Sequence, residues 1–367
     1  MKEYNWRKER EKYRAVSNED MQRTEEVSQP AAAPAKKMQW KGILSTALTV
    51  ATLIAIAAWV IVHYYGDSSV RLSSVAEKHK EAVGLITMTF EFEHGQKVTV
   101  PLGTAWAFSP NQFATNAHVI SAIQDIYRSQ ISSAVNKLLS MQALEAKCSS
   151  VKDYLSKKSK EQADDIVNKA KASILNGIKD VKIRININNS NRKSYDVTHF
   201  AVHKEYGDSD TKFNPDVAVL TIPDQHSTFF KIATKKQLYS LKSGKPIAFL
   251  GFPMENLSNN NVNINNPVAS MQSGIIVAIS DFELVNKGEK ENVLIRHNLP
   301  ATGGASGSPI FTTSGEVIAL LYGGNMIRTQ KAAGSSRTPS AAQINFAVRV
   351  DLLTGIGSSS DIKDLFK

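Results

Sequence analysis

The sequence contains a single cysteine, Cys148, among 367 residues. One cysteine cannot form a disulfide within the chain, so the fold must be stabilised by its hydrophobic core, as in cytosolic proteins and in exported bacterial proteins without disulfides. The chain also lacks a basic block interleaved with aromatic residues, because the Lys and Arg residues behind its net charge of +10 are spread along the sequence. We therefore expect no nucleic-acid partner, and interpret the charge as surface solvation and attraction to membranes.

Charged residues are absent from residues 42–62. About twenty apolar residues at a rise of 1.5 Å per residue span the ~30 Å hydrocarbon core of a bilayer. A cleavable signal peptide is one alternative, but the polar residues 1–41 precede the run and no A-x-A-like cleavage site follows it. A buried globular helix is the other. We predict a transmembrane helix at 42–63, with aromatic residues near its ends at Trp40, Trp59, Tyr64 and Tyr65.

The charges beside this run predict its orientation. Lys36, Lys37 and Lys41 precede it, whereas Arg71 is the first Lys or Arg after it. Positive residues remain on the cytoplasmic side of a membrane, so the tail 1–41 is expected in the cytoplasm. The rest of the chain is then expected on the periplasmic or extracellular side of the inner (plasma) membrane.

A serine flanked by glycines stands toward the end of the chain, in Gly303-Gly304-Ala305-Ser306-Gly307-Ser308-Pro309. A serine hydroxyl becomes reactive when a base removes its proton and N–H groups stabilise the oxyanion that forms. Gly304 lacks a Cβ and can take the dihedrals that point its N–H, with that of Ser306, into one cavity. Ser306 is the candidate nucleophile and these two N–H groups the candidate oxyanion hole, although such a stretch is by itself more typical of a loop.

Two other stretches supply a candidate base and a candidate acid. His118 follows the small apolar segments 103–108 and 114–117, and Asp216 follows Asn214-Pro215 and opens the apolar run 217–222. The remaining histidines lack such a context and are interpreted as structural: His63, His79, His94, His199, His203, His226 and His297. Other aspartates compete for the acid but begin no continuous apolar strand: Asp196, Asp208, Asp210 and Asp224.

The three candidates occur in the order His, Asp, Ser, which is the order of the chymotrypsin arrangement. Together the stretches resemble the trypsin-like (chymotrypsin-fold) serine peptidases, and among them the bacterial HtrA/Deg-like and V8-like branches. The resemblance implies a mainly β fold of two six-stranded antiparallel barrels, with His118 and Asp216 on the first and Ser306 on the second. It implies neither a metal nor another cofactor.

The resemblance also implies a lining for the first substrate pocket: Pro300, Ala301, Thr302, Leu321, Tyr322 and Gly323. No acid lies in the first of these segments, and glutamate-specific V8-like relatives tend to carry a histidine where Leu321 stands, so a modest apolar side chain is expected. Ser308 takes the place of a glycine in many relatives and is interpreted as structural. The residues after Asp351 are too few for the PDZ domain of HtrA relatives, so none is expected.

One block departs from the strand pattern of the predicted peptidase domain, 68–355. Apolar residues recur every three or four positions over 121–178, which predicts a helical hairpin inserted into the first barrel. Ser159 and Gln162 form a candidate capping box at the start of its second helix. The hairpin is either a cap packed on the barrel or an arm for a protein partner or self-association. Residues 356–367 are expected to form a C-terminal tail.

Two functions remain open at this point. The first is a membrane-anchored serine endopeptidase that cleaves extracytoplasmic protein through His118, Asp216 and Ser306. The second is a scaffold on a peptidase fold, catalytically silent or triggered by a partner, in which the helical insertion binds other proteins.

Overall fold

The structure is a computed structural model. It describes residues 52–56, 59, 67–208, 213–253, 263–300, 302–324, 326–331, 334–339 and 344–366. The predicted cytoplasmic tail 1–41 and most of the predicted transmembrane helix 42–63 lie outside these residues. No helix in the described part of the chain combines the length and the apolar character needed to cross a membrane. The chain divides into two units, Met1–Tyr64 and Tyr65–Lys367, and the second contains every element discussed below.

The first sheet of this unit has eight antiparallel strands in the order β17-β6-β7-β3-β2-β1-β4-β5. Its strands are β1 (Val83–Phe92), β2 (Lys97–Ser109), β3 (Gln112–Thr115), β4 (Ile178–Ile187), β5 (Ser194–Asp196), β6 (His199–Val202), β7 (Ala218–Thr221) and β17 (Ser360–Asp361). The prediction of a closed six-stranded barrel is wrong for this sheet, because its end strands β5 and β17 do not pair with each other in the described residues. Both are short edge strands that lengthen the sheet without closing it.

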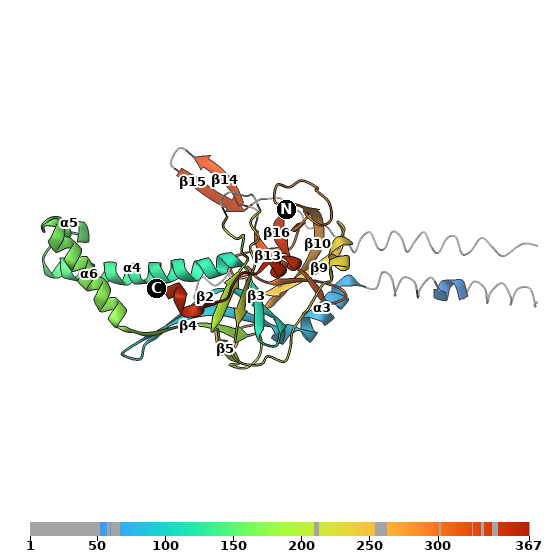
Figure 1. The fold of residues 1–367 in the computed structure, drawn as a ribbon, viewed down its shortest axis with the longest axis horizontal. Coiled ribbons are helices and arrows are strands. Elements are labelled where there is room, and N and C mark those ends of the chain that lie inside the picture. The colour runs from blue at the N-terminus through green and yellow to red at the C-terminus, as the bar shows by residue number, and fades with distance from the viewer. Residues whose placement is uncertain are drawn as a thin grey trace, which may run out of the picture. The chain divides into compact units, whose positions relative to one another are not determined.

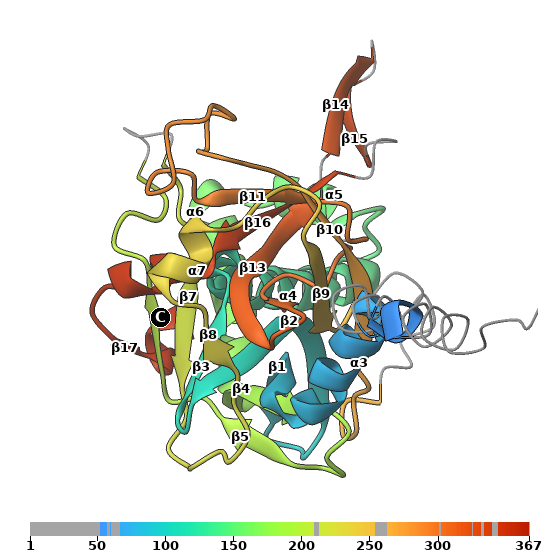
Figure 2. The ribbon, with the colours of Figure 1, turned by 90° about the vertical axis from the view of Figure 1, so that its right-hand side faces the viewer.

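The second sheet has seven strands in the order β12-β9-β10-β11-β16-β13-β8, and β12 also pairs with β13. Its strands are β8 (Lys231–Ile232), β9 (Pro246–Gly251), β10 (Ser270–Ser280), β11 (Leu294–His297), β12 (Pro309–Thr312), β13 (Glu316–Gly324) and β16 (Asn345–Arg349). The β12–β13 pairing closes six of them into a barrel, so the predicted six-stranded barrel is confirmed here. Figure 2 looks onto this sheet and onto the separate hairpin of β14 (Met326–Lys331) and β15 (Gly334–Pro339).

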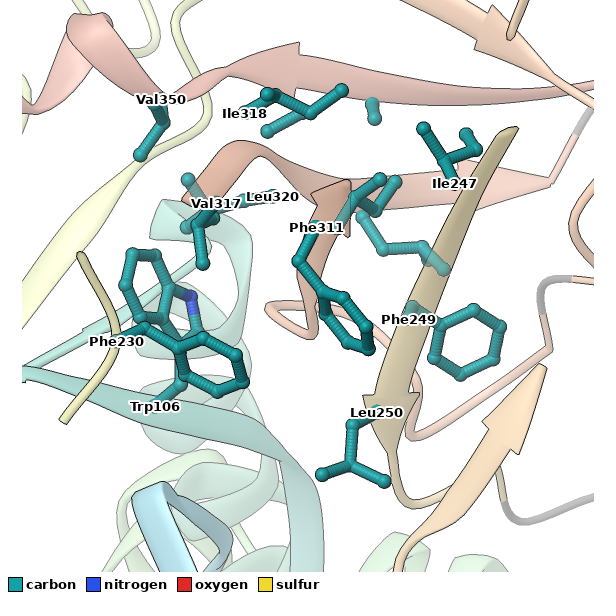
Figure 3. Close-up of a cluster of buried hydrophobic side chains, with 14 of the residues drawn as sticks. Trp106, Phe230, Ile247, Phe249, Leu250, Phe311, Val317, Ile318, Leu320 and Val350 are labelled. Carbon is teal, nitrogen blue, oxygen red and sulfur yellow. The ribbon is translucent and has the colours of Figure 1, made fainter. Parts of the chain in front are cut away.

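A shared hydrophobic cluster joins the two sheets. Trp106 comes from β2 of the first sheet, and its ring meets that of Phe230 edge-on at a centroid distance of 6.1 Å. Phe230 in turn stacks on Phe311 of β12 at 5.6 Å. Figure 3 shows these rings pointing into one cluster with Phe249 and Leu250 of β9. Each such fully buried large side chain stabilises the fold by about 1.5–3 kcal/mol, so the cluster stabilises the packing of the two sheets against each other.

The predicted helical insertion is present between β3 and β4, and we call it the arm. It consists of α4 (Ala117–Glu145), α5 (Val151–Ser156) and α6 (Lys160–Asn176). The capping box between Ser159 and Gln162 forms as predicted. The arm has a small core of its own around Ile131, Val135, Leu139 and Ala170. Figure 1 shows it extending away from both sheets, with α5 at its far end.

Residues 356–366, expected as a tail, pack on the domain. Ser360 and Asp361 form β17 beside β6, and the short helix η3 (Ile362–Phe366) follows. The Phe366 ring lies 5.2 Å from that of Tyr127 on α4, centroid to centroid. The end of the chain therefore supports the part of α4 that lies next to the first sheet.

Candidate active site

Two consecutive turns form the segment that carries Ser306. The Ala305 N–H donates to the Thr302 carbonyl at 3.1 Å, and the Ser308 N–H donates to the Ala305 carbonyl at 3.0 Å. The third position of each turn is a glycine with positive φ, +86° at both Gly304 and Gly307. This dihedral characterises the third position of a type II turn and is costly for any residue with a Cβ. Ser306 is thereby held at the second position of a turn, just before β12.

Gly307 is needed for a second reason. A Cβ at this position would collide with the Thr104 carbonyl oxygen and the Thr115 hydroxyl, and would lie 3.2 Å from Thr115 Cα. The turn therefore lies directly against β2 and β3 of the first sheet. Glycine at 307 allows the nucleophile segment of one sheet to approach the histidine-bearing side of the other.

Asp216 binds His118 through both carboxylate oxygens. The distance from His118 Nδ1 to Asp216 Oδ2 is 2.5 Å, and the His118 backbone N–H donates to Asp216 Oδ1 at 2.7 Å. The Asp216 side chain is 1% exposed, whereas that of His118 is 39% exposed. A buried carboxylate at the N-terminus of α4 is also stabilised by the helix dipole. The aspartate is thus fixed, while the imidazole keeps one side open to solvent.

The segment before α4 is fastened to the same aspartate. Asn116, the N-cap residue of α4, donates its side-chain amide to the Asp216 carbonyl at 2.7 Å. His118 is the second residue of the helix, so its position follows from where α4 begins. The sequence predicted the insertion from residue 121, whereas the helix already begins at Ala117 and includes the histidine.

The pKa values of Tyr206 and Tyr322 are affected by burial and by the charge of Asp216. Burial raises the pKa of each phenol above its ordinary value, and the negative charge of Asp216 raises it further. Tyr322 lies on β13 of the second sheet and is one of the predicted pocket residues. The predicted pocket strand is therefore close to the His118–Asp216 pair.

Thr104 on β2 connects the nucleophile segment to the first sheet. Its N–H donates to the Ser306 carbonyl at 3.0 Å, and its hydroxyl donates to the Gly304 carbonyl at 2.9 Å. The same hydroxyl accepts the Phe252 N–H at 3.1 Å, and the Thr104 carbonyl accepts the Thr115 hydroxyl at 2.8 Å. Thr104 is fully buried. Sequence reasoning gave this residue no role, because a threonine in a run of small residues carries no distinguishing signal.

The backbone of Gly103 lies close to both Ser306 and Val119, the residue after His118. A Cβ built on Gly103 would lie 3.3 Å from the Ser306 carbonyl oxygen and 3.2 Å from Val119, the residue after His118. The Ser306 hydroxyl makes no hydrogen bond to another described residue, so the Ser–His contact is open in this structure. Such contacts often form only when substrate binds. Ser308, by contrast, is fully buried, and its hydroxyl has no hydrogen-bond partner among the described residues.

The predicted pocket residues have different environments. Leu321 is 1% exposed and belongs to the hydrophobic cluster shared by the two sheets, and Tyr322 packs against that cluster. Thr302 is half-buried, and its hydroxyl has no hydrogen-bond partner in the described part of the chain. Pro300 is exposed, Gly323 faces open space, and Ala301 lies outside the described residues. The pocket composition therefore stays a prediction.

The structure also contains a separate cavity of about 650 Å³. Phe213, three residues before Asp216, lines it together with Tyr239, Phe282 and the buried Arg349. Arg349 is held by Asp351 at 2.7 Å and by the carbonyls of the loop that precedes β11. None of the predicted pocket residues lines this cavity, so it is distinct from the predicted substrate pocket.

Residues 103–320 match the family model described as the trypsin-like peptidase domain. The match covers more than half of the chain and includes His118, Asp216 and Ser306, so the chain belongs to the trypsin-like peptidases. No curated protein sequence matches it significantly.

Solved structures of peptidases also match this chain, at low sequence identity. The HtrA-type protease AlgW, solved with a decapeptide, is 12% identical with a TM-score of 0.42, and the match covers 77% of this chain and 65% of AlgW. Deg5 is 11% identical with a TM-score of 0.39, covering 78% and 92% of the two chains. The Rv3671c protease from M. tuberculosis in its active form is 14% identical with a TM-score of 0.39, covering 79% and 85%. This chain thus spans about two thirds of the AlgW chain.

Proposed function

We propose that this protein is a membrane-anchored serine endopeptidase that cleaves extracytoplasmic proteins. The observation that carries the proposal is the pair formed by His118 and the buried Asp216, with both carboxylate oxygens engaged. Thr104 holds the Ser306 segment beside that pair through the carbonyls of Gly304 and Ser306. Membership of the trypsin-like peptidases supports the same reaction class.

In the proposed reaction, Ser306 Oγ attacks the carbonyl carbon of a peptide bond while His118 Nε2 accepts its proton. The N–H groups of Gly304 and Ser306 stabilise the oxyanion, and Asp216 holds the imidazole through Nδ1. The tetrahedral intermediate collapses, the C–N bond breaks, and His118 returns the proton to the leaving amine. Water, deprotonated by the same imidazole, then hydrolyses the acyl-enzyme. No step requires a metal or another cofactor.

We further propose a location and a substrate preference. The uncharged run 42–62 and the lysines before it support a single-pass anchor with a cytoplasmic N-terminus. This orientation places the peptidase domain outside the cytoplasm. The absence of an acid at Pro300–Thr302, together with Leu321, favours a modest apolar side chain before the cleaved bond.

One observation favours the second function, a scaffold that is silent or triggered by a partner. Ser306 Oγ makes no hydrogen bond to His118 in the described residues, as expected for a site that assembles only on a signal. The arm, which begins at the catalytic histidine, would be the element that receives such a signal.

Labelling with a fluorophosphonate probe separates the two functions. The probe reacts with an activated serine, so the full-length protein in membranes is expected to label, and Ser306→Ala and His118→Ala are expected not to. Cleavage of an unfolded protein such as casein should follow the same pattern. Labelling that survives Ser306→Ala would exclude the assigned nucleophile. Absence of labelling with or without casein would leave the scaffold as the better account.

A further inference from the structure

The far end of the arm, residues 141–160, combines exposed apolar side chains with an excess of positive charge, and we call it the arm tip. Met141 is 55% exposed and Leu144 is 76% exposed, although both lie on a helix whose other large apolar residues are mostly covered. The short helix α5 has no buried residue at all. These side chains cost free energy in water unless another surface covers them.

Lysines are frequent in the same segment as these apolar side chains. The arm tip contains five lysines and two acidic residues. Asp153 pairs with Lys157 at 3.1 Å, so the charges of this pair largely cancel. The other lysines form no ion pair within the described part of the chain: Lys147, Lys152, Lys158 and Lys160. The arm tip therefore carries exposed apolar side chains together with an excess of positive charge.

Hydrogen bonds hold the arm tip in this shape without help from the domain. Asp153 accepts the Ser149 N–H at 3.0 Å, and the Ser150 side chain caps α5 by accepting the Asp153 N–H at 3.1 Å. Lys158 lies over the Tyr154 ring at 5.8 Å from its centroid. The tip thus presents a preformed surface and does not need to fold on its partner.

The distance from the catalytic histidine argues against a direct catalytic role for the tip. The 29 residues of α4 correspond to about 43 Å at 1.5 Å per residue. Figure 1 shows the tip at the end of the arm, away from both sheets. A surface at this distance suits an extended partner that lies beside the domain.

We propose that the arm tip binds an anionic membrane surface, with Met141 and Leu144 entering the headgroup region and the lysines contacting acidic lipids. Lysine is depleted at protein–protein interfaces, whereas exposed apolar side chains accompanied by lysines are typical of segments that bind the membrane interface. Lysine also extends its charged end toward headgroups while its methylene chain stays on apolar surface. The proposal goes beyond the predicted anchor 42–63, because it concerns a second contact made by the folded domain.

The single cysteine allows a site-specific test. Cys148 lies in the arm tip, so a small environment-sensitive fluorophore attached to it reports on the tip alone. The full-length protein is reconstituted into vesicles of phosphatidylcholine, or of equal parts of phosphatidylcholine and phosphatidylglycerol, with a quencher on shallow lipid positions. We expect quenching in the anionic vesicles, little in the neutral ones, and loss of quenching at high salt.

Two tip variants and a matched control sharpen the test. Each lysine near an anionic surface contributes a factor of about five, so replacing Lys147, Lys152 and Lys158 by Gln should weaken tip binding on the order of 100-fold. Met141→Ser with Leu144→Ser should abolish shallow quenching. The control, Lys169→Gln with Leu175→Ser, changes exposed residues of the same types elsewhere on the arm and should behave like the parent.

Each failure has its own signature. Equal quenching in neutral and anionic vesicles, or none in either, would overturn the proposal. A fluorescence change that depends on protein concentration without lipid would instead indicate self-association through the arm. Failure of the predicted anchor is detected separately, because alkaline carbonate would then release the protein from neutral vesicles. In that case, flotation of the protein with anionic vesicles measures binding through the arm tip. Fluorophosphonate labelling of the same samples reports on catalysis independently.

Discussion

The two ends of α4 belong to one helix but have opposite environments. Near its start, Val119, Ile120 and Ile123 are at most 3% exposed and pack into the core of the first sheet. Near its end, Met141 and Leu144 are more than half exposed. The first end carries His118, the candidate base, whose position must be held for the proposed reaction. The other end is free of that constraint and is available for binding.

The middle of the helix separates the two ends energetically. Ile131, Val135 and Leu139 pack on α6 in a cluster that is distinct from the core of the first sheet. A segment with its own small core can open locally without unfolding the domain. We therefore expect changes in the arm to leave the catalytic site intact, and changes at the start of α4 to affect both stability and catalysis.

The largest expected difference in labelling rate is between substitutions of two hydrogen-bonded aspartates, Asp216 beside His118 and Asp153 in the arm tip. Asp216→Asn removes the negative charge beside His118 and should lower the rate of fluorophosphonate labelling by about 10⁴-fold. The reason is that the side chain at 216 would no longer fix the imidazole tautomer or stabilise the protonated imidazole. Asp153→Asn removes a carboxylate that also has hydrogen-bond and ion-pair partners, in the arm tip, and should change the labelling rate by less than about twofold. Comparable losses in both variants would contradict the separation of arm and site.

Core truncation at two points along α4 tests the same separation through stability. Ile123→Ala removes a fully buried side chain and should lower the free energy of unfolding by about 2–5 kcal/mol, measured by denaturant titration. Leu139→Ala lies in the arm core and should increase hydrogen exchange in α4 and α6 while leaving the main unfolding transition in place. A shared loss of the main transition would show that the arm and the sheet unfold as one unit.

Acid should destabilise the domain before the arm, since residues 121–178 contain no histidine. Burial lowers the pKa of His297 on β11 from 6.5 to about 4. Between these pH values the unfolded chain binds a proton that the folded chain does not, so stability falls as the pH decreases. The contribution reaches about 3 kcal/mol below pH 4. Thermal melts from pH 7 to 4 should show a smaller decrease for His297→Gln than for the parent, with the exposed His94→Gln as the control.

The smallest expected effect isolates the role of Thr104. Thr104→Val keeps the shape but leaves the Gly304 carbonyl and the Phe252 N–H without their partner, and should lower kcat by about 10- to 100-fold with little change in KM. Thr104→Ser retains the hydroxyl and should restore most of kcat. A change in melting temperature without a change in kcat would show that Thr104 is only structural.

Local signals made part of the site predictable. Gly304 was expected to take dihedrals that disfavour a Cβ, and its φ is +86°. Helical spacing and the Ser159–Gln162 capping box indicated the arm, because both depend on residues close in sequence. The short strands β5 and β17 could not be predicted, since two or three residues show no periodicity. Their pairing is also the reason that the first sheet has more strands than expected.

By itself, the sequence supplied His118, Asp216 and Ser306 as candidates in that order and predicted the helical nature of the insertion, while the resemblance to trypsin-like peptidases implied the second barrel that the structure closes. The candidates and the insertion depend on glycine conformation, on apolar periodicity and on motifs that lie within a few residues. Only the tertiary structure decided that the Thr104 hydroxyl holds the Gly304 carbonyl, two hundred positions away, and that α4 starts early enough to include His118. Such contacts form when separate segments pack together. The residues next to a threonine or a helix start in the sequence do not indicate which distant segment it will contact.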